Sequence, residues 1–163
     1  MEFETLSWDN YVFRQVTRDD CNIVHELLLE LCDYENLHTE FKSTPEDLEN
    51  ILFNLKCGDA ILVYDNESDE YIGVILLSYN YSTFKGKPGI FIEDFYIRED
   101  KRGIGIGTFL FKYMMRVAKE NGFGRIDWVC LKNNKPSIEF YEKLNAKQMP
   151  DWVMFRLDEK EFE

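Results

Sequence analysis

Apolar and polar residues follow two different spacings along this chain. Alternation with a period of two, or a short apolar run between turn residues, is typical of strands. These patterns occur at 11–15, 60–64, 71–79, 89–97, 125–131 and 152–157. Apolar residues three and four positions apart are typical of amphipathic helices. This spacing occurs at 23–34, 45–57, 106–121 and 136–144.

The predicted order is strand, two helices, three strands, helix, strand, helix and strand. An antiparallel first half followed by alternating strands and helices predicts an α/β fold, with helices flanking one mixed, mostly antiparallel sheet. The 163 residues contain no repeat, linker or low-complexity segment. We therefore expect a single domain over 1–163, with 1–10 as a flexible N-terminal extension.

The net charge of −12 argues against nucleic acid as a partner, because nucleic-acid binding needs a basic surface. An acidic surface suits a cationic substrate, and it equally suits a protein that only needs solubility. No apolar run is long enough to cross a membrane, and residues 1–10 are too acidic for a signal peptide. We expect a cytoplasmic protein that does not bind membranes. The four cysteines show no C-x-x-C spacing, so no metal site is expected.

The stretch 91–108 combines a strand, a charged turn, a glycine-rich loop and the start of a helix. The first N–H groups of a helix have no partner inside the helix and, together with the helix dipole, favour an anion. Glycines let a ligand approach those groups closely, and an arginine adds a cation. The predicted phosphate site consists of Arg102, Gly103, Ile104, Gly105, Ile106, Gly107 and Thr108.

The spacing of the glycines distinguishes between kinds of phosphate loop. A P-loop needs Lys-Ser/Thr after its last glycine, but Thr108 and Phe109 follow here. A dinucleotide fingerprint needs a third glycine where Thr108 stands. The pattern that fits is Arg-x-x-Gly-x-Gly, which resembles the acetyl-CoA pyrophosphate loop of the GNAT N-acetyltransferase superfamily. This resemblance implies acetyl-CoA as co-substrate, acetyl transfer to an amine, and the GNAT fold.

A second motif, Asn-x-Pro-Ser-x-x-Phe-Tyr at 134–141, lies at the distance from the glycine loop that the resemblance requires. The leaving thiolate needs a proton, and a tyrosine with an ordinary pKa of about 10 is protonated at neutral pH. We interpret Tyr141 as this donor; the alternative is a tyrosine that only packs in the core. The residues expected to contact the CoA arm are Asn134, Lys135, Pro136 and Ser137.

Removal of the amine proton needs a carboxylate, and the central predicted strand contains Glu93 and Asp94. Adjacent strand residues point to opposite faces, so one acid can face the substrate while the other is structural. We favour Glu93 as the base, acting through a water molecule; in the alternative, both acids are structural. In the resembled family this strand is bulged, which implies that Phe95, Tyr96 and Ile97 meet the thioester and the pantetheine arm.

Longer matches narrow the resemblance to the spermidine/spermine (diamine) N-acetyltransferases. They comprise Ile-Glu-Asp-Phe-Tyr at 92–96, the glycine run, the motif at 134–141, and the segments 17–21 and 31–35. The likeness implies a homodimer and a small-molecule amine held in a channel. The residues that it assigns to that channel are Tyr34, Glu35, Glu93, Asp127, Trp128 and Asp151.

The chain departs from that narrower family near the expected amine site. Ser82 and Phe84 stand where the family tends to have an acid and a tryptophan, and the segment 149–152 is shorter. No cysteine lies in the motifs, so we expect direct acetyl transfer, with a polyamine or diamine as the first acceptor. A lysine-like amino acid, an aminoglycoside-like amine and a protein amine stay open, as does a CoA-binding sensor without turnover.

Overall fold

The computed structural model describes residues 1–162 and divides the chain into two compact units, Met1–Val129 and Cys130–Glu163. The first unit contains the β-sheet and most of the helices. The second contains helix α4 (Lys135–Lys143) and the C-terminal segment that follows it. The expected single domain over 1–163 stays a prediction.

Six strands form one sheet, in the order in which they occur along the chain. They are β1 (Leu6–Trp8), β2 (Tyr11–Gln15), β3 (Gly58–Asp65), β4 (Glu70–Ser82), β5 (Lys87–Ile97) and β6 (Arg125–Trp128). The first five are antiparallel neighbours, and β6 pairs parallel to β5. Helix α3 (Ile106–Glu120) makes the crossover that a parallel pair needs. The predicted mixed, mostly antiparallel sheet is confirmed.

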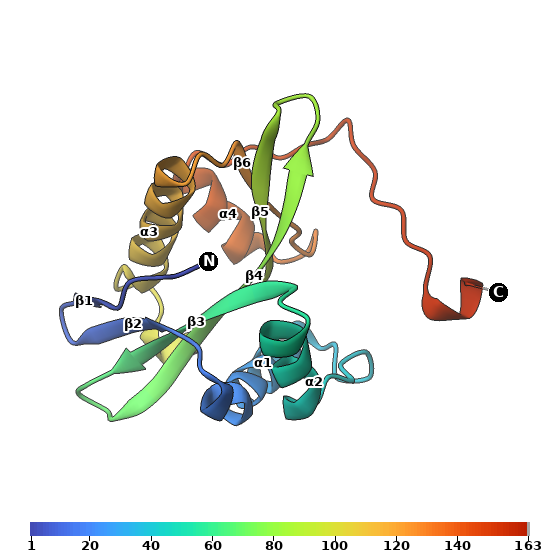
Figure 1. The fold of residues 1–163 in the computed structure, drawn as a ribbon. Helices are drawn as coiled ribbons and strands as arrows, with labels where there is room; N and C mark the ends of the chain where they lie inside the picture. The colour runs from blue at the N-terminus through green and yellow to red at the C-terminus, as the bar shows by residue number, and fades with distance from the viewer. Residues whose placement is uncertain (163) are drawn as a thin grey trace. The chain divides into compact units, whose positions relative to one another are not determined.

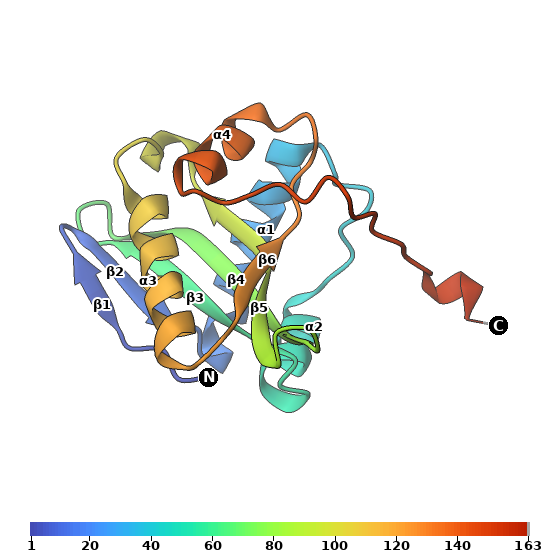
Figure 2. The same ribbon diagram turned by 90° about the horizontal axis from the view of Figure 1, so that it is seen from above.

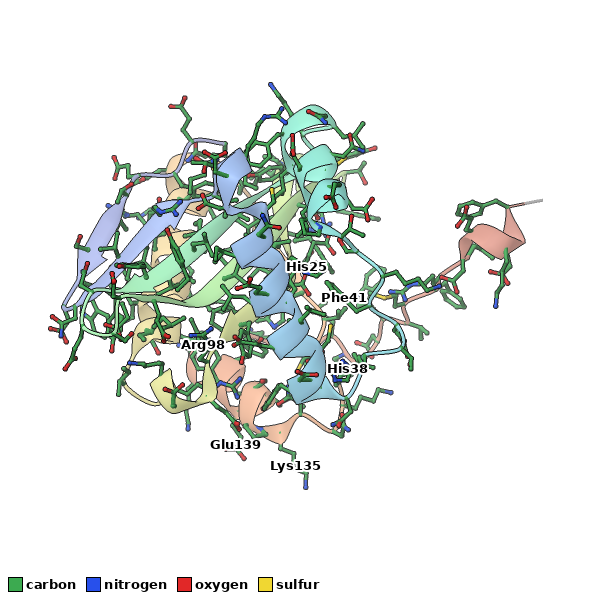
Figure 3. The ribbon with its side chains drawn as sticks, turned by 90° about the horizontal axis from the view of Figure 1, so that it is seen from below. His25, His38, Phe41, Arg98, Lys135 and Glu139 are labelled. Carbon is green, nitrogen blue, oxygen red and sulfur yellow. The ribbon has the colours of Figure 1, made fainter. Side chains whose placement is uncertain are left out.

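Helices cover both faces of the sheet in the first unit (Figures 1 and 2). Helix α1 (Cys21–Glu35) and helix α2 (Pro45–Glu49) lie on one face, and Figure 3 shows α1 running across it. A π-helical turn, Asn50–Asn54, extends α2. Helix α3 covers the other face and buries Leu110 and Met114 completely. Within residues 1–162, none of the helices has the length and apolar character needed to cross a membrane.

Strand β1 lies in the segment that the sequence predicts as a flexible extension. Trp8 pairs with Tyr11, which leaves Asp9 and Asn10 as a two-residue hairpin loop. Asp9 has a φ of 54°, and positive φ angles are typical of two-residue hairpin turns. The Trp8 ring stacks on Phe109 of α3, with centroids 5.4 Å apart. Part of the N-terminal segment is therefore an edge of the sheet.

The prediction of a last strand at 152–157 is wrong, because these residues have no regular structure. Alternating apolar residues form a strand only where a neighbouring strand accepts and donates the backbone hydrogen bonds. The second unit provides no such strand among its described residues. Trp152, Val153 and Phe155 are 72%, 74% and 91% exposed. The C-terminal segment therefore presents large apolar side chains to solvent.

Candidate functional site

The glycine loop lies between the 3-10 turn η3 (Glu99–Lys101) and helix α3. Gly103 and Gly105 have φ angles of 79° and 107°, in the left-handed region that favours glycine. A Cβ atom at Gly105 would come 3.0 Å from the ring of Trp8, whereas one at Gly103 would meet nothing within 4 Å. Gly105 is the N-cap of α3, so the unpaired N–H groups of the first helical turn follow it directly. This geometry fits an anion such as the pyrophosphate of CoA.

Contacts with the sheet fix the position of the residues that lead into this loop, Lys101 and Arg102. Lys101 Nζ lies 2.7 Å from Asp65 Oδ2 at the end of β3, and Asp65 is only 1% exposed. Burial alone would raise the pKa of Asp65, but the bonds from Lys101 and from the backbone N–H of Glu67 outweigh burial and lower the pKa. Arg102 Nε donates to the carbonyl oxygen of Ile97 at 2.7 Å. The loop is therefore anchored to the sheet where it begins, through the last residue of η3 and the residue that follows it.

Strand β5 contains a β-bulge at Glu93. Leu77 of β4 pairs with Ile92, and the next residue of that strand, Leu76, pairs with Asp94. Glu93 is thus the extra residue, with no partner of its own on β4. A bulge bends its strand and changes the direction of the side chains around it. The bulge that the family resemblance implies for this strand is present.

The bulge places Glu93 and Asp94 on the same face of the sheet. Asp94 pairs with Leu76, whose side chain belongs to the apolar core beneath α1. Ser78 shares that face, because it lies two residues from Leu76 on β4, and its hydroxyl donates to Glu93 Oε1. The prediction that the two acids point to opposite faces is therefore wrong, because one extra residue interrupts the period of two.

Three carboxylates gather on this face, and we call Glu35, Glu93 and Asp94 the acid cluster. Burial raises the pKa of Asp94 to about 6, and the charges of Glu93 and Glu35 add to the effect. Burial also raises the pKa of Glu35, the last residue of α1. A neighbouring negative charge raises the pKa of a carboxyl group only when the two groups are close together. The three carboxylates are therefore close enough to bind one cationic group together. Within residues 1–162, no group of three or more His, Cys, Asp or Glu side chains is arranged to hold a metal ion.

Asp94 is the member of the acid cluster to which the sequence assigned no role in the chemistry. One feature of the sequence could have indicated a role for Asp94: it directly follows another acid, Glu93, in an otherwise apolar strand. A carboxylate in such a strand needs a partner or a function, because its burial is unfavourable. What the sequence does not contain is the register of β4 against β5, which decides the face of Asp94.

The edge of β5 beyond the bulge has no strand beside it. The parallel pairing with β6 ends where Ile92 meets Trp128. The residues 95–97 therefore pair only with β4, counting the strands within residues 1–162. Backbone groups on an open strand edge can pair with an extended ligand as they would with another strand. This arrangement fits the expected contacts of Phe95, Tyr96 and Ile97 with a thioester and a pantetheine arm.

The two predicted substrate contacts on β6 lie on opposite faces of the sheet, as adjacent strand residues do. Asp127 Oδ2 lies 2.8 Å from Arg125 Nε in an ion pair. Trp128 pairs with Ile92, and its ring meets that of Phe111 on α3 with centroids 5.4 Å apart. The structure thus places Trp128 on the α3 face, opposite the acid cluster.

Tyr34, the remaining predicted contact on α1, lines a pocket of about 380 Å³ beside the glycine loop. The residues around this pocket are Glu30, Asp33, Tyr34, Tyr96, Glu99 and Arg102. The guanidinium carbon of Arg102 lies 4.2 Å from the centroid of the Tyr34 ring and 5.6 Å from that of Tyr96. Burial raises the pKa of Tyr96 to about 12, and Glu30 adds to the effect. The arginine of the predicted cofactor loop is therefore in contact with the tyrosine of the predicted amine site.

The second unit contains the four residues expected to contact the CoA arm. Asn134 is the N-cap of α4, and its Oδ1 accepts a bond from the backbone N–H of Ser137 at 3.3 Å. Lys135 and Pro136 form the start of the helix, and Figure 3 labels Lys135 with Glu139 one turn further on. The cap uses the side-chain oxygen of Asn134, so a contact from Asn134 to a ligand would use its side-chain NH2 as a donor.

Tyr141 lies in the second half of α4, and its ring centroid is 5.4 Å from that of Phe140. Asp151 lies in the exposed C-terminal segment, outside any helix or strand. The role of Tyr141 as a proton donor and that of Asp151 as a substrate contact stay predictions.

Comparisons with known proteins agree with this geometry. A family model described as the acetyltransferase (GNAT) family matches residues 24–146. Thialysine N-epsilon-acetyltransferase from Caenorhabditis elegans is 29% identical over 152 residues, which cover 91% of this chain and 92% of that protein. L-ornithine N5-acetyltransferase from Arabidopsis thaliana is 24% identical over 188 residues, covering 88% of this chain and 82% of that protein.

The likeness to a spermidine/spermine enzyme is more limited. The human spermidine/spermine N(1)-acetyltransferase-like protein 1 is 24% identical, over 95% of this chain but only 24% of its own length. Among solved structures, an integron cassette protein from V. cholerae superposes with a TM-score of 0.75 at 19% identity. That superposition covers 93% of this chain and 94% of the other, and it concerns the fold alone.

Proposed function

The chain belongs to the acetyltransferase (GNAT) family, and we propose that it transfers an acetyl group from acetyl-CoA directly to a primary amine of a small polycation. The first acceptor that we propose is a polyamine or diamine such as spermidine or spermine. The observation that carries this proposal is the acid cluster at the β5 bulge. An amine with more than one positive charge would find three carboxylates on one face of the sheet, next to an open strand edge.

In this proposal the acid cluster binds the substrate in its ammonium form. Glu93, the member of the cluster at the bulge, takes one proton through a water molecule, because only the neutral amine has a lone pair for attack. Asp94 and Glu35 hold a second ammonium group of the same substrate. The two positive charges of a diamine thereby use different carboxylates.

Bound acetyl-CoA would supply an activated acetyl thioester, whose thiolate leaves when the amine attacks. The loop residues 102–108 hold the pyrophosphate through backbone N–H groups and a cation. The β5 backbone at 95–97 orients the thioester and stabilises the negative charge that develops on its oxygen. Tyr141 gives its hydroxyl proton to the departing sulfur. The protein itself forms no acyl intermediate in this scheme.

A second candidate acceptor is a diamino acid, and the observation that favours it is the naming of the relatives. Two of them are named for thialysine and ornithine, which are amino acids with a side-chain amine. A diamino acid also carries an α-carboxylate, which the acid cluster repels. We therefore rank it second to a polyamine.

The experiment that tests the proposal measures thiol release from acetyl-CoA by the purified protein. Spermidine, spermine, putrescine, ornithine and thialysine are compared at equal concentration, with a reaction lacking amine as control. We expect the highest kcat/KM for an amine with two or more cationic groups and no carboxylate. A higher value for ornithine or thialysine would move the proposal to the diamino acids. CoA binding without turnover of any amine would contradict it and favour a CoA sensor.

We also infer that the chain works as a homodimer, with each chain forming one domain over 1–163. The C-terminal segment supports this inference, because exposed apolar side chains such as those of Trp152 and Phe155 are typical of surfaces that another protein covers. Light scattering should give twice the monomer mass. Replacement of both residues by serine should shift the equilibrium toward monomer, and a monomeric wild-type protein would contradict the inference.

A further inference from the structure

Arg102 occupies a place that would suit a cation of the substrate. Its guanidinium carbon lies 4.2 Å from the ring centroid of Tyr34 and 5.6 Å from that of Tyr96. Its Nε also donates to the backbone carbonyl of Ile97 at 2.7 Å. Two aromatic faces and a carbonyl oxygen are the groups that bind an alkylammonium ion, so this cage is chemically a cation site.

The walls of the pocket reinforce this preference for a cation. Three carboxylates line it, from Glu30, Asp33 and Glu99. Arg98 already binds Glu30, with Nη2 2.8 Å from Oε1. Asp33 and Glu99 remain, and their two negative charges exceed the single positive charge of Arg102. Asp33 also contacts His38. The pocket volume of about 380 Å³ is large enough to hold an alkylammonium group.

Arg102 is also the cation of the glycine loop, next to Gly103 and three residues before the N-cap of α3. A pyrophosphate offers a guanidinium two charged oxygens, and charge-assisted, bidentate bonds of this kind are stronger than contact with an aromatic ring. One guanidinium fills one of these places at a time. The choice between them is therefore set by whether an anion is present at the loop.

We propose that Arg102 is a tethered cation that covers Tyr34 in the free protein, moves to the pyrophosphate when CoA binds, and so exposes an ammonium site between Tyr34 and Tyr96. The inference rests on the proposed function, since it assigns a place to a third charged nitrogen of a polyamine such as spermidine, beyond the two that the acid cluster holds. Its consequence is that CoA and the amine bind with positive coupling, and by linkage each increases the affinity for the other.

Titration calorimetry with spermidine, in the absence and in the presence of saturating CoA, tests the coupling without turnover. In the wild-type protein, CoA should raise the affinity for spermidine about 2- to 30-fold, the range expected from loss of a competing cation–π contact. In Arg102→Gln, the affinity of the free protein should rise by a similar factor, and the affinity of the CoA complex should stay unchanged.

A general effect of charge would give a different result. Loss of one positive charge near the site raises the affinity for a cation equally with and without CoA, and that outcome would overturn the proposal. Arg116→Gln is the matched control, because this guanidinium lies 5.3 Å from the ring of Tyr113 on α3 and its loss removes the same charge. Tyr34→Leu, combined with Arg102→Gln, should abolish the gain in the free protein, because the exposed ammonium site needs the Tyr34 ring.

A second measurement does not depend on the amine. The ring current of Tyr34 should shift the side-chain NMR resonances of Arg102 in the free protein, and CoA should remove that shift. A shift that CoA leaves unchanged would overturn the movement of Arg102, even if spermidine is acetylated. Loss of the shift with CoA, in a protein that acetylates another amine, would retain the movement and refute only the proposed acceptor.

Discussion

The glycine loop and the β5 bulge lie in the same unit but suit ligands of opposite charge. The loop presents backbone N–H groups, which suit an anion, and Gly103 and Gly105 adopt φ angles of 79° and 107° there. The bulge brings the side chains of Glu93 and Asp94 to one face of the sheet, near Glu35, and such a group of carboxylates suits a cation. The anion site therefore depends on backbone conformation and the cation site on strand register. Substitutions at the two places should affect different substrates.

The largest effect is expected from Glu93→Gln, which tests the cation side. Loss of the base should lower kcat about 100- to 1000-fold, because general-base catalysis contributes this much. The affinity for CoA should stay unchanged, as measured by calorimetry. Glu120→Gln, which makes the same change at an exposed acid at the end of α3, away from the acid cluster and from the pocket beside Arg102, is the control. A kcat within a few-fold of wild type would remove Glu93 from the role of base.

Tyr141→Phe tests a residue outside both places, in the second unit. It should lower kcat about 10- to 1000-fold, because the leaving thiolate loses its proton donor. The affinities for CoA and for the amine should change little, since the ring is retained. Steady-state kinetics with spermidine and acetyl-CoA measures the split between kcat and KM. Unchanged turnover would show that Tyr141 only packs.

Gly105→Ala tests the anion side. The φ of 107° and a Cβ atom 3.0 Å from the Trp8 ring would strain or displace the loop, so the affinity for CoA should fall about 10-fold or more. Gly103→Ala is the matched control, because its φ of 79° is also positive but its Cβ would meet nothing within 4 Å. A larger loss at Gly103 than at Gly105 would show that contact with Trp8 is unimportant.

The smallest expected effect is a dependence on pH, which tests the ionisation of Asp94 in the acid cluster. Burial raises the pKa of Asp94 to about 6 in the folded protein, above the ordinary 3.8 of an aspartate, so folding disfavours its ionised form. Below about pH 3 the group is protonated in both the folded and the unfolded state, so it causes no loss of stability. The loss grows as the pH rises from there through about 6. Relative to Asp94→Asn, the wild type should lose on the order of 1–3 kcal/mol of unfolding free energy across this range.

The same ionisation should affect binding in the opposite sense. The wild-type KM for spermidine should fall several-fold between pH 5 and pH 7, because ionised Asp94 attracts a cation. Denaturation by urea and steady-state kinetics at each pH measure the two effects. Identical pH profiles for wild type and Asp94→Asn would show that Asp94 does not titrate in this range.

The two regions also differ in how far the sequence predicts them. The loop is visible as Arg-x-x-Gly-x-Gly, because its chemistry needs particular residue types at fixed spacing. The bulge is not visible, because it depends on how β4 and β5 pair over a long distance in the chain. Glu93 could be chosen from the sequence as a candidate base, but the face of Asp94 could not.

The ends of the chain show the same limit. Leu6–Trp8 is too short to give a strand pattern, and only its two-residue turn and the packing of Trp8 place it in the sheet. The residues 152–157 have the pattern of a strand but form none, because a strand also needs a neighbour. The central elements, in contrast, form near the predicted ranges, since their apolar residues alone determine which side is buried.

The contact between Trp8 and Gly105 has a practical consequence for measurement. Trp8 is one of three tryptophans in the sequence, and its indole packs directly on the glycine loop. Replacement of Trp128 and Trp152 by phenylalanine would leave it as the single strong fluorophore. The fluorescence emission of Trp8 should then change when a ligand binds the loop. Because Trp8 lies on the edge strand β1, ligand binding could be followed by intrinsic fluorescence, without an attached dye.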